Sequence, residues 1–302
     1  MTGFMLLGLG GLTTAQAQTL DTVEVADGVY AIVGPHGQRS PDNFANNATF
    51  GAVITSAGIV LIDSGGSAKG AAMIDAALAE IRELPVSHVI NTGGQDHRWL
   101  GNGYFQERGA ALIASNDAVD DQQARETDQL FMLGNLLGED GLAGTEPVFA
   151  DETFDVPTDL NIGGVSFRLI PVGPAHTPGD AVVWLPQQRV AFAGDVVFAE
   201  RLLGILPVSS SAGWIEAFDV LAALEPAVIV PGHGRPLDLE TARAQTRDYL
   251  AHVRSEVGAV LDNGGDIHEA TAIDQRAFAE LIDFEQLAKR NAQAVFIEME
   301  WE

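Results

Sequence analysis

One short stretch, residues 91–102, constrains this chain more than any other. It follows an apolar run, residues 86–90, whose composition predicts a buried strand. Gly93 and Gly94 then end the strand, and three polar side chains follow at once: Gln95, Asp96 and His97. Because sites in α/β proteins are built beyond the carboxyl ends of strands, this loop is predicted to form part of a site.

Three further polar residues stand in the same setting, in Gly- or Pro-rich turns after strand-like runs: His176, Asp195 and His233. Imidazole and carboxylate are good ligands for zinc, iron or manganese. The chain has no cysteine, which excludes a thiolate site or a disulfide. Four loops are therefore predicted to converge on a metal site, and such sites can leave one position open for water.

The order of the segments predicts an α/β architecture. Two β-rich runs around Asp27 and Gly28 predict a hairpin, and residues 147–154 predict a later strand. Helices are predicted over residues 68–84, 116–138, 209–224 and 237–261. Strands outnumber helices in each half and each half ends in helices, which predicts two sheets packed together with helices outside.

The composition limits the partners of the chain. Its 302 residues include 42 Asp and Glu against 16 Lys and Arg, a formal net charge of −26. Such a surface repels phosphate backbones, so nucleic acid is not expected as a partner. The expected partner is a small-molecule substrate, and the sequence does not indicate an oligomeric state.

The N-terminal residues predict export. A short apolar run is followed by Ala15-Gln16-Ala17, a pattern typical of a secretory signal cleaved after Ala17, although the usual positive charges are missing. We therefore expect a signal peptide over residues 1–17, a single domain over 18–302 and a periplasmic or secreted protein. The apolar run is too short to span a bilayer.

The chain resembles the metallo-β-lactamase-fold hydrolase superfamily. The resemblance covers nearly all of the chain after residue 17 and rests on motifs in the right order: Leu61-Ile62-Asp63-Ser64-Gly65, Asn91-Thr92, Asp96-His97, Gly101-Asn102, His176-Thr177-Pro178-Gly179, Gly194-Asp195 and Gly232-His233-Gly234. It implies an α/β fold that is a four-layer αββα sandwich, with one or two metal ions, expected to be zinc, with iron or manganese as alternatives.

The stretch after Asn91-Thr92 departs from the His-x-His-x-Asp-His motif of this family. Aligned without a gap, the four motif positions are Gly93, Gln95, His97 and Arg98. Aligned on the Asp96-His97 pair, Thr92 and Gly94 replace the first two histidines. We prefer the first register because it keeps both flanks, and in either register at least one imidazole is lost.

The resemblance also implies roles for single residues. His97, Asp195 and His233 are expected to hold the firmer metal, and His176, Asp195 and Gln95 a second, labile one. Asp96 is predicted to be a ligand and proton shuttle or else a turn cap. Arg98 and His36 are candidates for substrate binding, against the simpler alternatives of a surface ion pair and a solvated loop residue. Asp63 is expected to orient the site loop from behind.

The leading functional hypothesis is an exported metallo-hydrolase. A metal-bound hydroxide would attack an ester, thioester, lactone or amide bond, with a β-lactam as one candidate. The missing imidazoles leave a second hypothesis, an accessory protein that holds a metal or small ligand and turns over little. A third is an iron-dependent relative that does not hydrolyse its substrate.

Overall fold

The computed structural model of the protein describes residues 19–302. The predicted signal peptide, residues 1–17, lies outside the described residues. Among those that are described, no helix combines the length and the apolar character needed to cross a membrane.

Two mixed sheets form the centre of the molecule. The first has seven strands in chain order: β1 (Asp21–Ala26), β2 (Val29–Val33), β3 (Thr49–Thr55), β4 (Gly58–Ile62), β5 (Val86–Ile90), β6 (Ala111–Ser115) and β7 (Glu152–Phe154). The second has five, in the order β12-β11-β10-β9-β8: β8 (Thr158–Ile162), β9 (Val165–Pro171), β10 (Ala181–Leu185), β11 (Val190–Phe198) and β12 (Val228–His233). The first four strands are antiparallel neighbours, and β4 to β7 are parallel.

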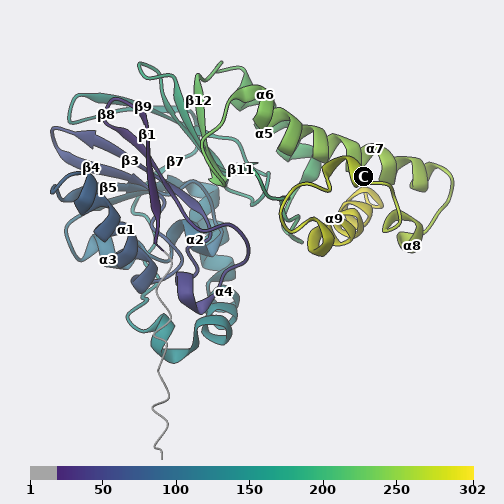
Figure 1. Cartoon of the computed structure of the whole chain (residues 1–302), viewed down its shortest axis with the longest axis horizontal. Helices are drawn as coiled ribbons and strands as arrows, with labels where there is room; N and C mark the ends of the chain where they lie inside the picture. Colours follow the sequence, from purple (N-terminus) through teal and green to yellow (C-terminus); the bar gives the residue numbers. More distant parts are fainter. Residues whose placement is uncertain (1–18) are drawn as a thin grey trace, which may run out of the picture.

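Helices cover the outer face of each sheet (Figure 1). On the first sheet lie α1 (Ala68–Ile81), α2 (Asp96–Trp99), α3 (Asn102–Gln106) and α4 (Asn116–Leu142), with the short turn η1 (Pro41–Asn43) beside α4. The second sheet contacts α5 (Ser211–Ala222), α6 (Leu239–Ala242) and the π-helical turn η2 (Arg243–Arg247). Beyond them lie α7 (Asp248–Asp262), α8 (Ile267–Ala270), η3 (Arg276–Phe278) and α9 (Phe284–Met299), and α7, α8 and α9 pack on one another (Figure 1). This is the predicted αββα arrangement of two sheets flanked by helices.

Alternating apolar residues explain why two sheets pack face to face. Phe167 and Leu169 of β9 point into the same buried cluster as Val53 of β3 and Ile62 of β4. Side chains of the opposite parity, such as Leu61, face α1 instead. Each central strand is therefore apolar on both faces, as strands buried between two layers must be.

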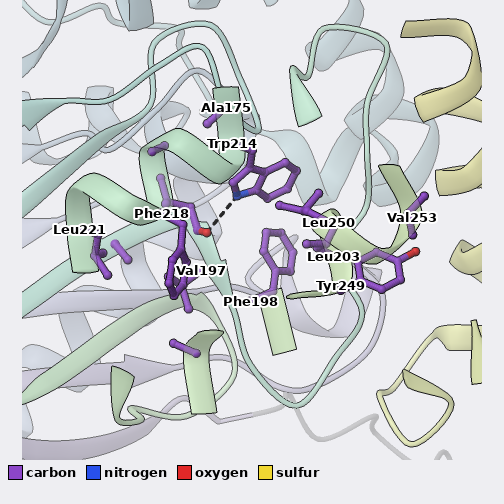
Figure 2. Close-up of a cluster of buried hydrophobic side chains, with 14 of the residues drawn as sticks. Ala175, Val197, Phe198, Leu203, Trp214, Phe218, Leu221, Tyr249, Leu250 and Val253 are labelled. Atoms are coloured by element: carbon purple, nitrogen blue, oxygen red, sulfur yellow. Dashed lines mark hydrogen bonds between the residues drawn. The ribbon is translucent and has the colours of Figure 1, made fainter. Parts of the chain in front are cut away.

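The outer layer of the second sheet is organised around Trp214 of α5. Its indole is fully buried, and its Nε1 donates a 2.9 Å hydrogen bond to the Val196 carbonyl. Phe198 of β11 and Leu250 of α7 belong to the same cluster (Figure 2). Trp99, Trp184 and Trp214 are all buried, as the sequence predicts.

Several element boundaries differ from the sequence-based expectation. Only Glu152–Phe154 of the expected strand 147–154 pairs, and the Val148 carbonyl accepts a hydrogen bond from the Asn102 side chain. Helix α4 passes Gly138, whose φ of 70° marks a kink. The helix expected over 237–261 begins at Leu239 and is interrupted by η2. Helix α9 was not predicted.

Replacing Trp214 with alanine removes the largest side chain between α5 and β11. We expect Trp214→Ala to lower the free energy of unfolding by about 3–5 kcal/mol, because a buried aromatic leaves a cavity. Trp301→Ala is the control, since Trp301 is 86% exposed and should have little effect. Urea unfolding followed by circular dichroism measures both variants, and equal stabilities would contradict this assignment of the core.

Candidate metal centre

Loops and strand ends from both sheets meet at one edge of the sandwich. His97 follows β5 as the second residue of α2, and His176 lies in the loop from β9 to β10. His233 is the last residue of β12. Asp195 lies within β11, at an irregularity in its pairing with β12, rather than after the strand as the sequence suggests. The four predicted side chains are thus brought together, and each is at most 4% exposed.

Asp195 is the centre of this cluster. His97 Nε2 lies 3.2 Å from Asp195 Oδ2, and His233 Nε2 lies 3.3 Å from Oδ1. His176 Nε2 lies farther away, 4.0 Å from Oδ2. The donor atoms of His97, Asp195 and His233 all lie within 4.8 Å of one another. This is the set predicted for the firmer metal.

The outer nitrogens of the two nearer imidazoles are both committed to protein acceptors. His233 Nδ1 lies 2.9 Å from the Asn47 carbonyl, which can only accept, and 3.4 Å from Arg201 Nη1, so the shorter contact assigns the proton to this nitrogen. His97 Nδ1 lies 3.1 Å from the Asp96 carboxylate and is assigned as a donor for the same reason. With the proton on Nδ1, the arrangement that a metal ligand requires, the Nε2 lone pair of each ring faces Asp195. Burial lowers the pKa of His233 to about 3, which keeps this ring neutral.

Lone pairs that face a carboxylate repel it unless a cation lies between them. Within residues 19–302, His97 Nε2 is buried without a hydrogen-bond partner. Ligand atoms on one tetrahedral zinc ion stand roughly 3.3 Å apart, close to the 3.2 and 3.3 Å found here. The donor set, two imidazoles and a carboxylate held by further partners, fits a metal ion.

His176 stands at the edge of this group. Its ring packs on Trp214 and Phe198, with centroids 5.0 and 5.7 Å away. Burial lowers its pKa to about 4, and the positive charges of Arg98 and Arg125 act in the same direction. His176 and Asp195 are the histidine and the carboxylate proposed for the second metal. In residues 19–302 no third histidine or carboxylate joins them in a separate group of metal ligands.

Arg98 is buried behind the cluster around Asp195, so the prediction that it binds substrate is wrong. Its five N–H groups make five hydrogen bonds: to both Asp195 oxygens (3.0 and 2.6 Å), to Asp63 (2.9 Å) and to the Thr49 and Gly232 carbonyls (3.1 and 2.9 Å). The side chain is 1% exposed. Arg98 therefore has no donor left for a substrate carboxylate, and it is not a surface ion pair either.

The pairing with Arg98 fixes the charge of Asp195. Burial opposes ionisation, but the Arg98 guanidinium holds the pKa of this carboxyl well below its usual range. Asp63 supports the guanidinium from the other side. It also accepts hydrogen bonds from the Thr92 backbone and hydroxyl at 2.7 and 2.8 Å. Asp63 thus holds Thr92, at the start of the loop that carries His97, and its role in orienting the site stays a prediction.

Asp96 and Gln95 are engaged by two arginines that the sequence analysis did not single out. Asp96 accepts hydrogen bonds from the His97 backbone and ring on one oxygen and pairs with Arg39 on the other. Burial would raise its pKa, but Arg39 and His97 together lower it below the usual range. Gln95 Oε1 accepts a 3.3 Å hydrogen bond from Arg125. Asp96 is thus placed to position His97, and its role as proton shuttle stays a prediction.

His36 lies in the loop after β2, and the same loop carries Arg39. Its side chain is 37% exposed, and its Nε2 lies 3.4 Å from the Glu200 carboxylate. It is accessible from solvent, so a contact with substrate stays a prediction.

Comparison with known proteins decides the family. The family model described as the metallo-beta-lactamase superfamily matches residues 45–233, which include every member of the cluster around Asp195. The chain belongs to the metallo-beta-lactamase superfamily.

Relatives within the superfamily differ in activity. A linear primary-alkylsulfatase from a Pseudomonas species is 22% identical over 68% of this chain, and the chain spans 46% of its length. A metallo-beta-lactamase type 2 from Elizabethkingia meningoseptica is 23% identical over 83% of this chain and 94% of its own. The solved structure of a stereoselective inverting sec-alkylsulfatase from Pseudomonas sp. superposes with a TM-score of 0.72 at 16% identity, covering 92% of this chain and 50% of the sulfatase. These relatives share the superfamily or the fold of this chain, but they do not share one activity.

Helix α4 explains why position 94, a histidine position of the superfamily motif when Asp96 and His97 are aligned with it, holds glycine. Gln122 and Gln129 of α4 donate to the carbonyls of Gly93 and Gly94 at 3.1 and 2.9 Å. A Cβ atom on Gly94 would lie 1.8 Å from the Asp121 carboxylate. The helix packs so closely on the loop that a side chain at Gly94 has no room.

Removing the Arg98 guanidinium should destabilise the fold. Arg98→Met leaves Asp63 and Asp195 buried without their cation, which we expect to cost about 3–5 kcal/mol of unfolding free energy. The matched control is Arg276→Met, which breaks an Arg–Asp pair on the surface. Urea unfolding of the metal-free protein measures both, and a fully stable Arg98→Met variant would show that the buried pair is not required.

A methyl group at Gly94 should also destabilise the protein. Gly94→Ala forces Asp121 and its partner Arg125 to move, which we expect to cost about 1–3 kcal/mol. Gly134→Ala, on the same helix α4, is the control because its Cβ would meet only Leu142, at 3.7 Å. Thermal unfolding compares the two variants. Equal melting temperatures would mean that α4 does not constrain the loop.

Proposed function

We propose that this protein is a hydrolase that works with a single metal ion held by His97, Asp195 and His233. The observation that carries the proposal is the convergence of the Nε2 atoms of His97 and His233 on one buried, ionised carboxylate. Residues 19–302 do not support a second complete set of metal ligands, because only His176 lies on the other side of Asp195. Helix α4 covers Gly93 and Gly94 through hydrogen bonds to their carbonyls.

Some residues of the centre would bind the metal ion, and others orient these ligands. When bound, the metal ion would lower the pKa of a bound water and polarise the scissile bond. Asp96 and the Asn47 carbonyl hold the Nδ1 protons of His97 and His233, which directs both lone pairs inward. Arg98 keeps Asp195 ionised and fixed. The neutral His176 is placed to accept a hydrogen bond from water or substrate at the edge of the centre.

The bond we propose is an ester, thioester, lactone or amide. The metallo-beta-lactamase relative supports an amide, with a β-lactam among the candidates, and the alkylsulfatase relatives support an ester. We favour an ester of a small molecule. The charge of −26 makes a nucleic-acid substrate unfavourable.

Zinc is the metal we propose, with iron or manganese as alternatives. Two imidazoles and one carboxylate are a ligand set that zinc enzymes use with one position left open. Export to the periplasm or the medium is proposed from the sequence alone, on the apolar run and the Ala15-Gln16-Ala17 pattern.

A second candidate is a protein that binds a metal or small ligand and turns over little. It is favoured by the loss of the motif imidazoles and by His176 Nδ1, which is buried without a hydrogen-bond partner in the described part of the chain. Turnover of ester substrates by the metal-loaded protein separates the two candidates.

His233 provides the direct test of the ligand set. We expect His233→Ala to lower the bound metal from about one ion per chain to well below that, since three protein ligands are the usual minimum for such a site. His268→Ala, on the exposed α8, is the control. Elemental analysis of protein purified without added zinc or chelator gives the stoichiometry and identifies the metal.

The same two variants are assayed for hydrolysis of nitrophenyl esters and alkyl sulfates. Activity that falls together with the metal in His233→Ala supports the proposal. An unchanged metal content in His233→Ala would overturn the ligand assignment, and a fully loaded protein without turnover would favour the second candidate.

A further inference from the structure

Two arginines flank the outer side of the metal centre. Arg39 follows β2 and pairs with Asp96, and Arg125 of α4 reaches Gln95, the preceding residue. Arg125 also pairs through two nitrogens with Asp121. Their side chains are 31% and 19% exposed, in contrast to the fully buried Arg98.

Both guanidinium groups keep donors for a ligand. A guanidinium has five N–H groups. Within residues 19–302, Arg39 uses one in its bond to Asp96, and Arg125 uses three in its bonds to Asp121 and Gln95. Unlike Arg98, each arginine can therefore still bind an anion, and guanidinium groups bind carboxylate and sulfate oxygens in pairs.

The arginines open into a cavity with an apolar wall. This cavity, of about 310 Å³, is lined by Arg39, Arg125 and Asp96 and by the apolar side chains Met132, Leu206 and Val208. Met132 and Val208 are 65% and 36% exposed, so these two residues give the cavity an accessible apolar side.

The apolar wall continues away from the arginines. Leu206 and Pro207 line the first cavity and also a second one of about 370 Å³. The second cavity is bounded by Ile205 and by Ala294 and Ile297 of α9. An apolar chain that starts near the arginines can therefore extend along the loop of residues 205–208 towards α9.

The charges around the first cavity favour a ligand with a single negative charge. Asp96 neutralises part of Arg39, and the exposed Asp128 also lines the cavity. Asp121 pairs with Arg125, so two guanidinium groups stand against three carboxylates, and the protein charges alone leave no surplus for a dianion. A divalent metal ion bound behind Asp96 would turn this balance positive, so the metal-loaded protein favours an anion with a single charge over a cation.

We propose that this cavity binds the substrate, and that the substrate class is an ester bearing one anionic group and an apolar chain. The anionic group lies on Arg39 and Arg125, beside the metal centre, and the chain lies along Met132 and Leu206. This inference rests on the proposed function, because the ligand is a substrate only if the protein hydrolyses it. Binding of the ligand does not depend on turnover.

Calorimetry with compounds that cannot be hydrolysed tests the binding. The metal-loaded protein is titrated with octanesulfonate, octanoate, octanol and octyltrimethylammonium. We expect both anions to bind at least about tenfold more tightly than the alcohol or the cation, the effect of one charge-assisted hydrogen bond. Octanesulfonate should bind more tightly than hexanesulfonate by about fourfold per buried methylene. Tighter binding of octanesulfonate than of octanoate indicates that the substrate is a sulfate ester. Tighter binding of octanoate indicates an ester whose anionic group is a carboxylate.

Substitutions locate the site. Arg125→Gln should weaken both anions about tenfold and leave octanol unchanged, because one charge-assisted contact is lost. Since this change leaves Asp121 without its cation, the double variant Arg125→Gln/Asp121→Asn is measured as well and should give the same loss. Met132→Ser should weaken the binding of the octyl compounds and reduce the gain in affinity per methylene. Phe131→Ser is the matched control, because the neighbouring Phe131 is 67% exposed and does not line the cavity.

The outcomes separate this inference from the proposed function. Anion binding that depends on Arg125 and Met132 supports the inference even if no ester is hydrolysed. Equal binding of octanol and octanesulfonate overturns it, and so does Arg125→Gln or Met132→Ser with unaltered affinities, even if the protein hydrolyses esters.

Discussion

The buried guanidinium of Arg98 is the interaction on which the rest of the site depends. Asp195 must be ionised to hold a cation, yet it is 2% exposed, in surroundings that oppose a charge. Arg98 offsets this cost through both carboxylate oxygens while Asp63 and two backbone carbonyls take its other donors. The remaining lone pairs of Asp195 are left facing His97 and His233.

The same guanidinium ties the two sheets together. Arg98 belongs to α2, behind the first sheet, while Asp195 and Gly232 belong to β11 and β12 of the second. Thr49, whose carbonyl it also reaches, begins β3. A single side chain therefore fixes the distance between the strand ends that carry the ligands. This explains how a cluster of three donors from different elements can be held within 4.8 Å.

Helix α4 gives the centre its asymmetry. Its close approach to the loop after β5 requires glycine at position 94, which is a histidine position of the motif in the register that aligns Asp96 and His97. The helix supplies Arg125 instead, a fixed positive charge in the same neighbourhood. The centre thus combines one group of metal ligands with an arginine-lined cavity beside it.

Much of the fold and part of the site could be predicted from the sequence. The hairpin of β1 and β2, the helix α1 and the meeting of His97, His176, Asp195 and His233 follow from periodicity and from rigid turns at strand ends. The burial of Arg98 could not be predicted, because it depends on carboxylates 35 and 97 residues away in the sequence. Helix α9 was missed although Ala288, Ala292, Val295 and Phe296 mark one buried face at helical spacing. The spacing of Asp121 and Arg125 likewise indicated a helical ion pair, but the contact with Gln95 depends on packing.

The location of bound metal tests the central claim most directly. Crystals of the protein loaded with zinc, measured on both sides of the zinc absorption edge, would show each ion as an anomalous peak. We expect one peak per chain, between His97 Nε2, Asp195 and His233 Nε2. A second peak of equal height beside His176, or a peak away from these residues, would contradict the account.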